Sequence, residues 1–164
     1  EVPSPEEFRA RIAHTLEKYP YLVAEKRGRI LGYAYVSPFK ERAAYDWAVE
    51  TSIYVDKAVK HSGIGGKLHA ALEQVLKKMG ILNMEACIGI PEKDDEYLDH
   101  NSMNFHAHLG YRLVGTFKKC GYKYDRWYDM IWMEKLIGNH TENQPYPKRY
   151  TPDILRTVLG ESED

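Results

Sequence analysis

A glycine-rich run in the middle of the chain has the composition of an anion-binding loop. The run consists of Lys60, His61, Ser62, Gly63, Ile64, Gly65 and Gly66. Glycines let an anion approach the backbone, and the free N–H groups at the start of a helix favour negative charge. Leu68 stands where a P-loop needs Ser or Thr for magnesium, and where the dinucleotide fingerprint needs its third glycine. The run therefore indicates a phosphate or pyrophosphate site of another kind, with a plain turn as the alternative.

Histidines and cysteines are the other residues whose types suggest chemistry. His106 and His108 are two residues apart and so project from different sides of a helix. His100 is not three or four residues from either of them, which is the spacing that zinc sites on helices use. Cys87 and Cys120 have no metal-ligand spacing, and two cysteines cannot form a disulfide framework. We expect no metal site, and we expect Cys87, in an apolar stretch, to be a buried thiol.

The elements that must position these residues form a mixed α/β pattern in one domain. Apolar and alternating patterns predict strands at 21–25, 30–36, 47–55, 82–90, 111–116 and 128–134. Helices are predicted after an N-cap at Ser4, over 68–79, and from a cap at Ser102 to Gly110. The order strand, glycine loop, helix, strand predicts parallel pairing of the strands on either side of the loop. We assign 1–137 to the domain and 138–164 to a polar tail that docks or frays.

Composition excludes several functional classes. The 164 residues carry 23 Lys and Arg against 24 Asp and Glu, a formal charge of -1, whereas a dedicated nucleic-acid binder normally has a basic excess. No apolar run reaches the roughly 20 residues that span a bilayer, and the N-terminus lacks a secretory pattern. We therefore expect a cytoplasmic protein that binds neither nucleic acid nor membrane.

The glycine loop and the strand before it resemble a known cofactor motif. Thr51-Ser52-Ile53-Tyr54-Val55 followed by the run from Lys60 to Gly65 is similar to the acetyl-CoA motif of the GNAT acetyltransferase superfamily, [Arg/Gln]-x-x-Gly-x-[Gly/Ala]. Lys60 departs from the usual first residue, because it keeps the charge of arginine without its planar fork. The resemblance implies that the loop amides hold the pyrophosphate of CoA and that the preceding strand splays from its neighbour to pair with the pantetheine arm.

Further segments resemble one family of that superfamily, the phosphinothricin acetyltransferases. They are 19–25, 44–47, 49–55 and 121–129, in the family's order, and the likeness covers roughly residues 4 to 136. It implies a mostly antiparallel sheet with a central, splayed parallel strand pair and helices on both faces. Members usually carry a strand and a helix, about 30 residues, ahead of the point that matches Glu1, so we expect the sheet to lack that first strand.

The resemblance also implies roles for individual residues. Glu50 is the expected general base, with an exposed strand glutamate as the alternative, and a backbone N–H near Val55 would stabilise the oxyanion. His106 is the expected general acid, with simple packing as the alternative. The acetyl-CoA contacts are assigned to Ile53, Tyr54, Val55, Lys60, His61, Ser62, Gly63, Ile64, Gly65, Gly66, Asp99 and Ser102. Asp99 replaces the family's usual asparagine.

The implied acceptor is a small amino acid or analogue of the phosphinothricin or methionine sulfoximine type, acetylated on its α-amine. Its expected contacts are cationic side chains and aromatic walls: Lys40, Arg42, Tyr45, Trp47, Tyr124 and Trp127. The family often binds its substrate near a dimer interface, so a homodimer is expected. The alternatives are an acetyltransferase for a protein N-terminus or a polyamine, and a CoA-binding module without catalysis.

Overall fold

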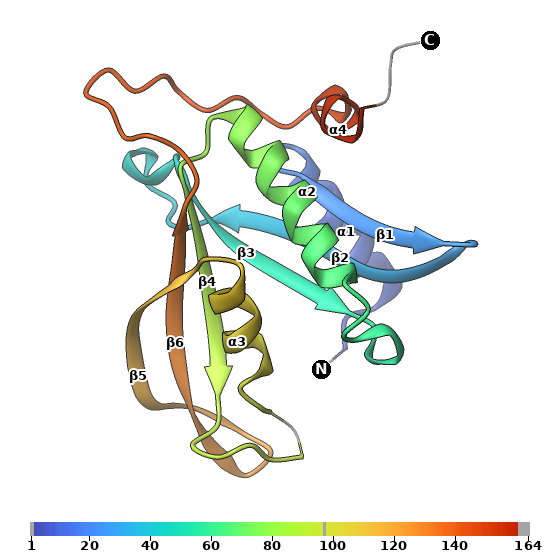
Figure 1. Ribbon diagram of the computed structural model, residues 1–164, viewed down its shortest axis with the longest axis vertical. Coiled ribbons are helices and arrows are strands. Elements are labelled where there is room, and N and C mark those ends of the chain that lie inside the picture. Colours follow the sequence, from blue (N-terminus) through green and yellow to red (C-terminus); the bar gives the residue numbers. More distant parts are fainter. Residues whose placement is uncertain (1, 97, 161–164) are drawn as a thin grey trace.

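The computed structural model describes residues 2–96 and 98–160, and it contains one mixed sheet with helices packed on it (Figure 1). The strands are β1 (Tyr21–Lys26), β2 (Arg29–Pro38), β3 (Ala48–Val55), β4 (Asn83–Ile90), β5 (Arg112–Lys123) and β6 (Arg126–Leu136). The helices are α1 (Pro5–Leu16), α2 (Ile64–Met79), α3 (Asn101–His108) and α4 (Pro152–Leu159). The mixed α/β fold class is thus confirmed.

The order of the strands in the sheet is β1-β2-β3-β4-β6-β5, and every pair is antiparallel except β3 and β4. The central parallel pair predicted from the glycine loop and the following helix is therefore confirmed. The long helix α2 connects these two strands, as a parallel connection requires. Figure 1 shows β3 and β4 close together at one end and spread apart at the other.

Helices lie on both faces of the sheet, as expected. Neighbouring residues of a strand point to opposite faces. In β2, the Tyr33 ring makes an edge contact with Phe8 of α1, with ring centroids 5.9 Å apart, whereas a side chain at Gly32 would meet Leu68 of α2. We call the α2 side the packed face and the α1 side the open face, because α1 lies over β1 and β2 and the large side chains Tyr54 and Phe117 are exposed on that side.

The hydrophobic core lies between the packed face and α2. It contains Val36, Val49, Leu72, Val75, Leu76, Met84 and Ile131, all almost fully buried. The buried positions of α2 recur every three or four residues, which is the spacing of one helix face. This core fixes the positions of β3, β4 and the start of α2, on which the candidate site depends.

Several boundaries differ from those predicted. The short helix α3 begins at Asn101, after the N-cap residue His100, so the predicted cap at Ser102 is wrong and Ser102 lies inside the helix. A carboxylate oxygen of Asp99 accepts the Asn101 N–H at 2.9 Å, which explains the earlier start. The two closing strands are longer than predicted, since β5 continues to Lys123 and β6 runs from Arg126 to Leu136.

The segment after β6 returns along the domain and docks on it. The Tyr150 N–H donates to the Lys18 carbonyl oxygen at 2.9 Å, and the Lys148 N–H donates to the Met79 carbonyl oxygen at 2.7 Å. The helix α4 packs against α2 through its apolar residues Ile154 and Leu155. Of the two outcomes left open for this tail, docking is the one that the described part of it adopts.

Candidate active site

The parallel strands β3 and β4 separate at a fork. Their ladder consists of three pairs and ends at Glu50 and Glu85. The Thr51 hydroxyl bridges the end of the ladder, because it donates to the Glu85 carbonyl oxygen at 3.2 Å. From there β4 stays paired with β6, while β3 continues to Val55 with no ladder partner on its β4 side among the described residues. The fork therefore offers unpaired backbone groups along β3, which suit an extended ligand that adds to a strand edge.

The glycine loop lies at the far end of β3 and opens α2. Gly63 is the N-cap of this helix and has a φ of 85°, a conformation that favours glycine, and it provides no side chain to cap the first N–H groups. The Ser62 hydroxyl donates to the carbonyl oxygen of Val59 and holds the loop in a turn. The first amides of α2 are thus available to an anion at the positive end of the helix dipole.

Gly65 serves packing. A Cβ at this position would lie 3.2 Å from the ring of Phe105, so the glycine lets α2 and α3 approach closely. By contrast, no neighbour lies within 4 Å of a Cβ built at Gly63 or Gly66. The three predicted glycines therefore have two roles, a turn with open space beside it and a close contact between helices.

The second predicted cofactor element is α3 and the residue before it. The Asp99 carboxylate caps this helix at Asn101, and the carbonyl oxygen of Ser102 accepts a hydrogen bond from Nδ1 of His106 at 2.7 Å. His106 is 4% exposed, and burial lowers its pKa, so its ring is neutral near pH 7. Because its Nδ1 proton is directed at Ser102, the structure accounts for His106 through packing, and its role as a general acid stays a prediction.

A buried polar cluster on the packed face was missed in the sequence. His69 of α2 forms a hydrogen bond of 2.8 Å with the Tyr111 hydroxyl, and Tyr111 also packs edge-on against His106. Burial lowers the pKa of His69 to about 4 and raises that of Tyr111. The signal was available, because His69 lies one residue after Leu68 and seven before Leu76 on the apolar side of α2. The cluster is neutral at pH 7 and joins α2 to the segment after α3.

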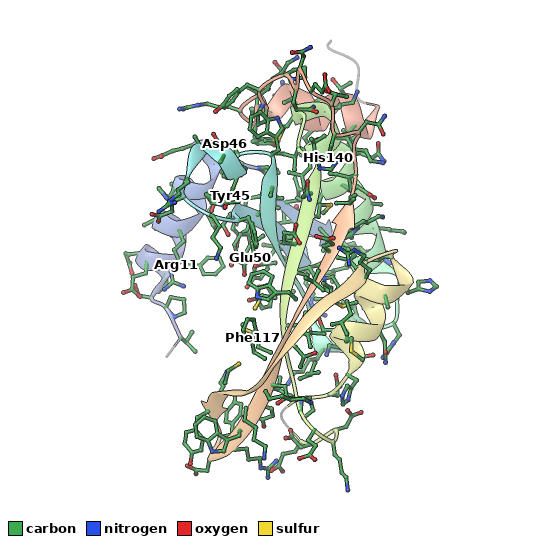
Figure 2. All side chains as sticks on the ribbon, turned by 90° about the vertical axis from the view of Figure 1, so that its left-hand side faces the viewer. Arg11, Tyr45, Asp46, Glu50, Phe117 and His140 are labelled. Carbon is green, nitrogen blue, oxygen red and sulfur yellow. The ribbon has the colours of Figure 1, made fainter. Side chains whose placement is uncertain are left out.

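Glu50 lies on the open face, half-buried beside the fork. It pairs in register with Ser37 of β2 on one side and with Glu85 on the other. Burial, and then the negative charge of Glu50, raises the pKa of Cys87, which places the two side chains near each other and keeps Cys87 a thiol. Cys87 itself is only half-buried, so it is less enclosed than predicted. In the view of Figure 2, Glu50 lies between Tyr45 and Phe117.

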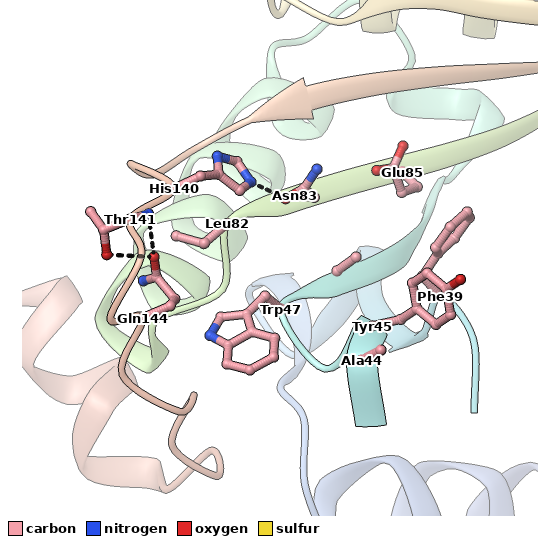
Figure 3. Close-up of a pocket in the computed structure, with 11 residues that line it drawn as sticks. Phe39, Ala44, Tyr45, Trp47, Leu82, Asn83, Glu85, His140, Thr141 and Gln144 are labelled. Atoms are coloured by element: carbon pink, nitrogen blue, oxygen red, sulfur yellow. Dashed lines mark hydrogen bonds between the residues drawn. The ribbon is translucent and has the colours of Figure 1, made fainter. Parts of the chain in front are cut away.

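The structure brings together only part of the predicted acceptor contacts. Lys40, Arg42 and Tyr45 line one hollow of about 540 Å³ together with Phe39 and Glu41. Tyr45 and Trp47 also line a neighbouring pocket of about 340 Å³, which Figure 3 shows. Trp47 additionally anchors the tail, since its Nε1–H donates to the Pro145 carbonyl oxygen at 2.9 Å.

The other two predicted contacts lie elsewhere. Tyr124 is in the turn between β5 and β6, and Trp127 packs against Tyr122 with ring centroids 5.0 Å apart. Figure 1 shows this hairpin tip at the opposite end of the sheet from the turn at 43–45. Within one chain, Tyr124 and Trp127 therefore do not join the group around Lys40 and Arg42.

Two negative findings bear on the site. Among the residues that the structure describes, no three His, Cys, Asp or Glu side chains are grouped so that they could hold a metal ion. In the same part of the chain, no helix has the length and apolar character needed to cross a membrane.

Known proteins share the sequence and the fold. Residues 1–132 match the family model described as the acetyltransferase (GNAT) domain. The phosphinothricin N-acetyltransferase of Streptomyces viridochromogenes is 35% identical over 127 residues, which are 77% of this chain and 66% of that protein, slightly less than two thirds of its length. The L-methionine sulfoximine/L-methionine sulfone acetyltransferase of Salmonella typhimurium is 30% identical over 128 residues, 78% of this chain and 71% of that one.

A solved structure extends the similarity over most of the fold. The crystal structure of a GNAT superfamily phosphinothricin acetyltransferase from Sinorhizobium meliloti in complex with AcCoA superposes with a TM-score of 0.78 and 35% identity. The match covers 92% of this chain and 78% of that chain. The similarity therefore extends over most of the chain.

Proposed function

The chain belongs to the GNAT acetyltransferase family, in its phosphinothricin acetyltransferase-like branch, and we propose that it transfers the acetyl group of acetyl-CoA to the α-amine of a small amino acid. The observation that carries the proposal is the position of Glu50 at the end of the β3–β4 ladder. There a carboxylate lies next to unpaired strand backbone, and the same strand leads towards the uncapped start of α2.

Acetyl-CoA fits the groups that the chain offers. The first N–H groups of α2 and the loop from Lys60 to Gly63 would hold the pyrophosphate, and the free edge of β3 would pair with the amides of the pantetheine arm. The bound cofactor supplies an activated thioester. The side chain of Ile53 points to the core and that of Tyr54 stacks on Tyr33 on the open face, so both would contribute through their backbone.

Glu50 starts the reaction by taking a proton from the acceptor's α-ammonium group. The freed nitrogen lone pair attacks the thioester carbon, and a backbone N–H near Val55 stabilises the oxyanion that develops. When the carbon–sulfur bond breaks, its electron pair stays on sulfur, which takes the second proton from nitrogen. The products are the N-acetyl amino acid, the CoA thiol and a proton on Glu50.

The acceptor would bind on the open face, which also carries Glu50, in the hollow that Tyr45 lines. Lys40 and Arg42 line this hollow and carry the charges that suit the acceptor's carboxylate, and Phe39 and Tyr45 provide its apolar contacts. The substrate class follows the relatives, whose names give phosphinothricin and methionine sulfoximine or sulfone as acceptors. The homodimer and the cytoplasmic location stay predictions.

Release of the CoA thiol, followed over a panel of free amino acids that includes phosphinothricin and methionine sulfoximine, tests the proposal. We expect turnover with at least one acceptor, and a fall of about 10²–10⁴-fold in kcat/KM for Glu50→Gln with CoA binding unchanged by calorimetry. The matched control is Glu25→Gln, the same change at an exposed position of β1, which should retain activity. Full activity in Glu50→Gln would show that another group is the base, and no turnover with folded protein would overturn the function.

A further inference from the structure

The pocket next to the proposed acceptor site has walls of different origin. Phe39, Tyr45 and Trp47 form an aromatic wall on the segment between β2 and β3. The opposite wall is formed by His140 and Gln144, which belong to the tail and lie beyond the residues that match the family model. The volume of about 340 Å³ is enough for the end of a small amino-acid side chain.

Between these walls the pocket is lined by Glu85, an acidic residue of β4. Figure 3 shows Asn83 and Glu85 on this strand, with His140 hydrogen-bonded to the Asn83 side chain at 2.8 Å. We call this space the Glu85 pocket. Glu85 is 6% exposed and forms no ion pair with another of the described residues. A carboxylate that is buried in this way is electrostatically unbalanced unless a ligand or a proton compensates its charge.

The surroundings of Glu85 add negative rather than positive charge. The neighbouring acid Glu134 of β6 pairs in register with Glu85, and the nearby cation Arg112 is engaged in an ion pair with Glu134. Burial, and then Glu134, raises the pKa of Glu85 to about 7, although a hydrogen bond from Asn83 and the charge of Arg112 lower it in part. Around neutral pH the carboxyl groups of Glu85 and Glu134 therefore share the positive charge of Arg112.

Three observations place the Glu85 pocket next to the proposed acceptor site. Glu85 is the register partner of Glu50 across the parallel ladder, where adjacent strands lie about 4.8 Å apart. Both side chains are on the open face. Phe39 and Tyr45 line this pocket and also the hollow that contains Lys40 and Arg42. An amino acid with its carboxylate at the cations and its α-amine at Glu50 would thus direct its side chain towards Glu85.

We propose that the Glu85 pocket receives the end of the acceptor's side chain and selects a neutral end that carries a hydrogen-bond donor over an anionic end. The inference rests on the proposed function and specifies its substrate class. Methionine sulfoximine ends in a neutral group with an N–H that a carboxylate accepts, whereas phosphinothricin ends in an ionised phosphinate. Placing a further anion beside Glu85 and Glu134 is unfavourable, because like charges in a desolvated site repel strongly.

The selectivity depends on pH through Glu85. Below its pKa the neutral acid can donate a hydrogen bond to a phosphinate oxygen, and above it the carboxylate repels the phosphinate. The charged and titratable groups near it are Glu50 of β3, Glu134 of β6, Arg112 of β5, Tyr111, Tyr45 of the loop and His140 of the tail. The ratio of kcat/KM for the sulfoximine to kcat/KM for phosphinothricin should therefore rise about tenfold between pH 6 and pH 8. Both acceptors carry an α-amine, so the titration of that group cancels in this ratio.

The test compares kcat/KM for methionine sulfoximine and for phosphinothricin in the unmodified protein and in Glu85→Gln. This substitution removes the charge but keeps a carbonyl oxygen that accepts a hydrogen bond. We expect the unmodified protein to prefer the sulfoximine by at least about tenfold at pH 8. In Glu85→Gln, turnover of phosphinothricin should rise about tenfold and turnover of the sulfoximine should change by less than about threefold. Glu25→Gln should leave both values unchanged.

The outcomes separate this inference from the function on which it rests. If acetyl transfer occurs but the ratio is the same in both proteins and constant with pH, the inference is wrong while the function stands. If no acceptor is turned over, the function is wrong, and calorimetric titration of the protein with each acceptor in the presence of CoA still tests the pocket. Equal affinities in that titration would also overturn the inference. The pH series on the unmodified protein serves where Glu85→Gln fails to fold.

Discussion

The two faces of the sheet bury ionisable groups in opposite ways. On the packed face, His69 and His106 are enclosed as neutral rings, and each has a hydrogen-bond partner, Tyr111 or the Ser102 carbonyl oxygen. On the open face, Glu85 is equally enclosed but lies beside a second acid. Burial lowers the pKa of the histidines and raises that of the carboxyl group.

This difference indicates that the buried ionisable groups of the packed face are compatible with high stability, whereas Glu85 on the open face lowers it near neutral pH. A neutral, hydrogen-bonded histidine costs the native state little at pH 7, because it carries no charge that needs hydration. A buried acid near its pKa costs free energy that a ligand can return by supplying a donor. We therefore expect changes on the packed face to affect mainly folding, and changes on the open face to affect mainly binding.

The largest expected effect on stability tests the packing difference. Leu72 of α2 is 1% exposed, and Leu72→Ala should lower the free energy of unfolding by about 2–5 kcal/mol, because it leaves a cavity in the core. Phe117 of the open face is 56% exposed, so Phe117→Ala should cost less than about 1 kcal/mol. Urea unfolding of both variants measures the difference. Similar losses would mean that the open face is covered in solution.

The second prediction concerns the histidine of the packed face. The pKa of His69 is about 4 in the folded protein and about 6.5 when unfolded, so the unfolded state binds more protons between these values. The free energy of unfolding is therefore highest above pH 6.5, where His69 is neutral in both states, and it falls as the pH is lowered towards 4. The free energy of unfolding should drop by about 2–3 kcal/mol more in the unmodified protein than in His69→Gln between pH 7 and pH 4.5, measured in urea. Parallel curves would contradict the lowered pKa.

The third and smallest effect has the opposite sign and belongs to the open face. The pKa of Glu85 is about 7 when folded and 4.5 when unfolded, so its proton is held more tightly in the native state. Its contribution is favourable below pH 4.5 and is lost as the pH rises through 7. Relative to the unmodified protein, Glu85→Gln should therefore gain about 2 kcal/mol between pH 5 and pH 8 in the same urea series. A constant difference between the two proteins would show that Glu85 is fully hydrated.

Much of the fold was predictable because local patterns determine it. The glycine loop and the apolar spacing of α2 predicted the parallel pair correctly, since such a connection has few alternatives. The extension of β5 was not predictable, because 117–123 lacks alternation and contains an irregularity between Phe117 and Gly121. The start of α3 depended on a side-chain cap from Asp99 rather than on the favoured serine.

The site was predictable where its residues are close in sequence. Lys40, Arg42 and Tyr45 come from one short segment, and the structure brings them into one hollow. Glu85 was missed, because an isolated acid in the apolar run 84–88 does not reveal its neighbours. Its environment depends on the register with β3 and β6 and on the distant tail, as the hydrogen bond between His140 and Asn83, 57 residues apart in the sequence, illustrates.

The position of the tail has an evolutionary consequence. The segment that holds His140 and Gln144 contacts the Glu85 pocket, whereas the fork and the glycine loop are built from residues before it. Substitutions in this segment therefore leave unchanged the residues that we propose bind acetyl-CoA. Exchange of residues 138–150 between homologues offers a route by which a lineage changes the lining of the Glu85 pocket while it keeps the fork and the glycine loop intact.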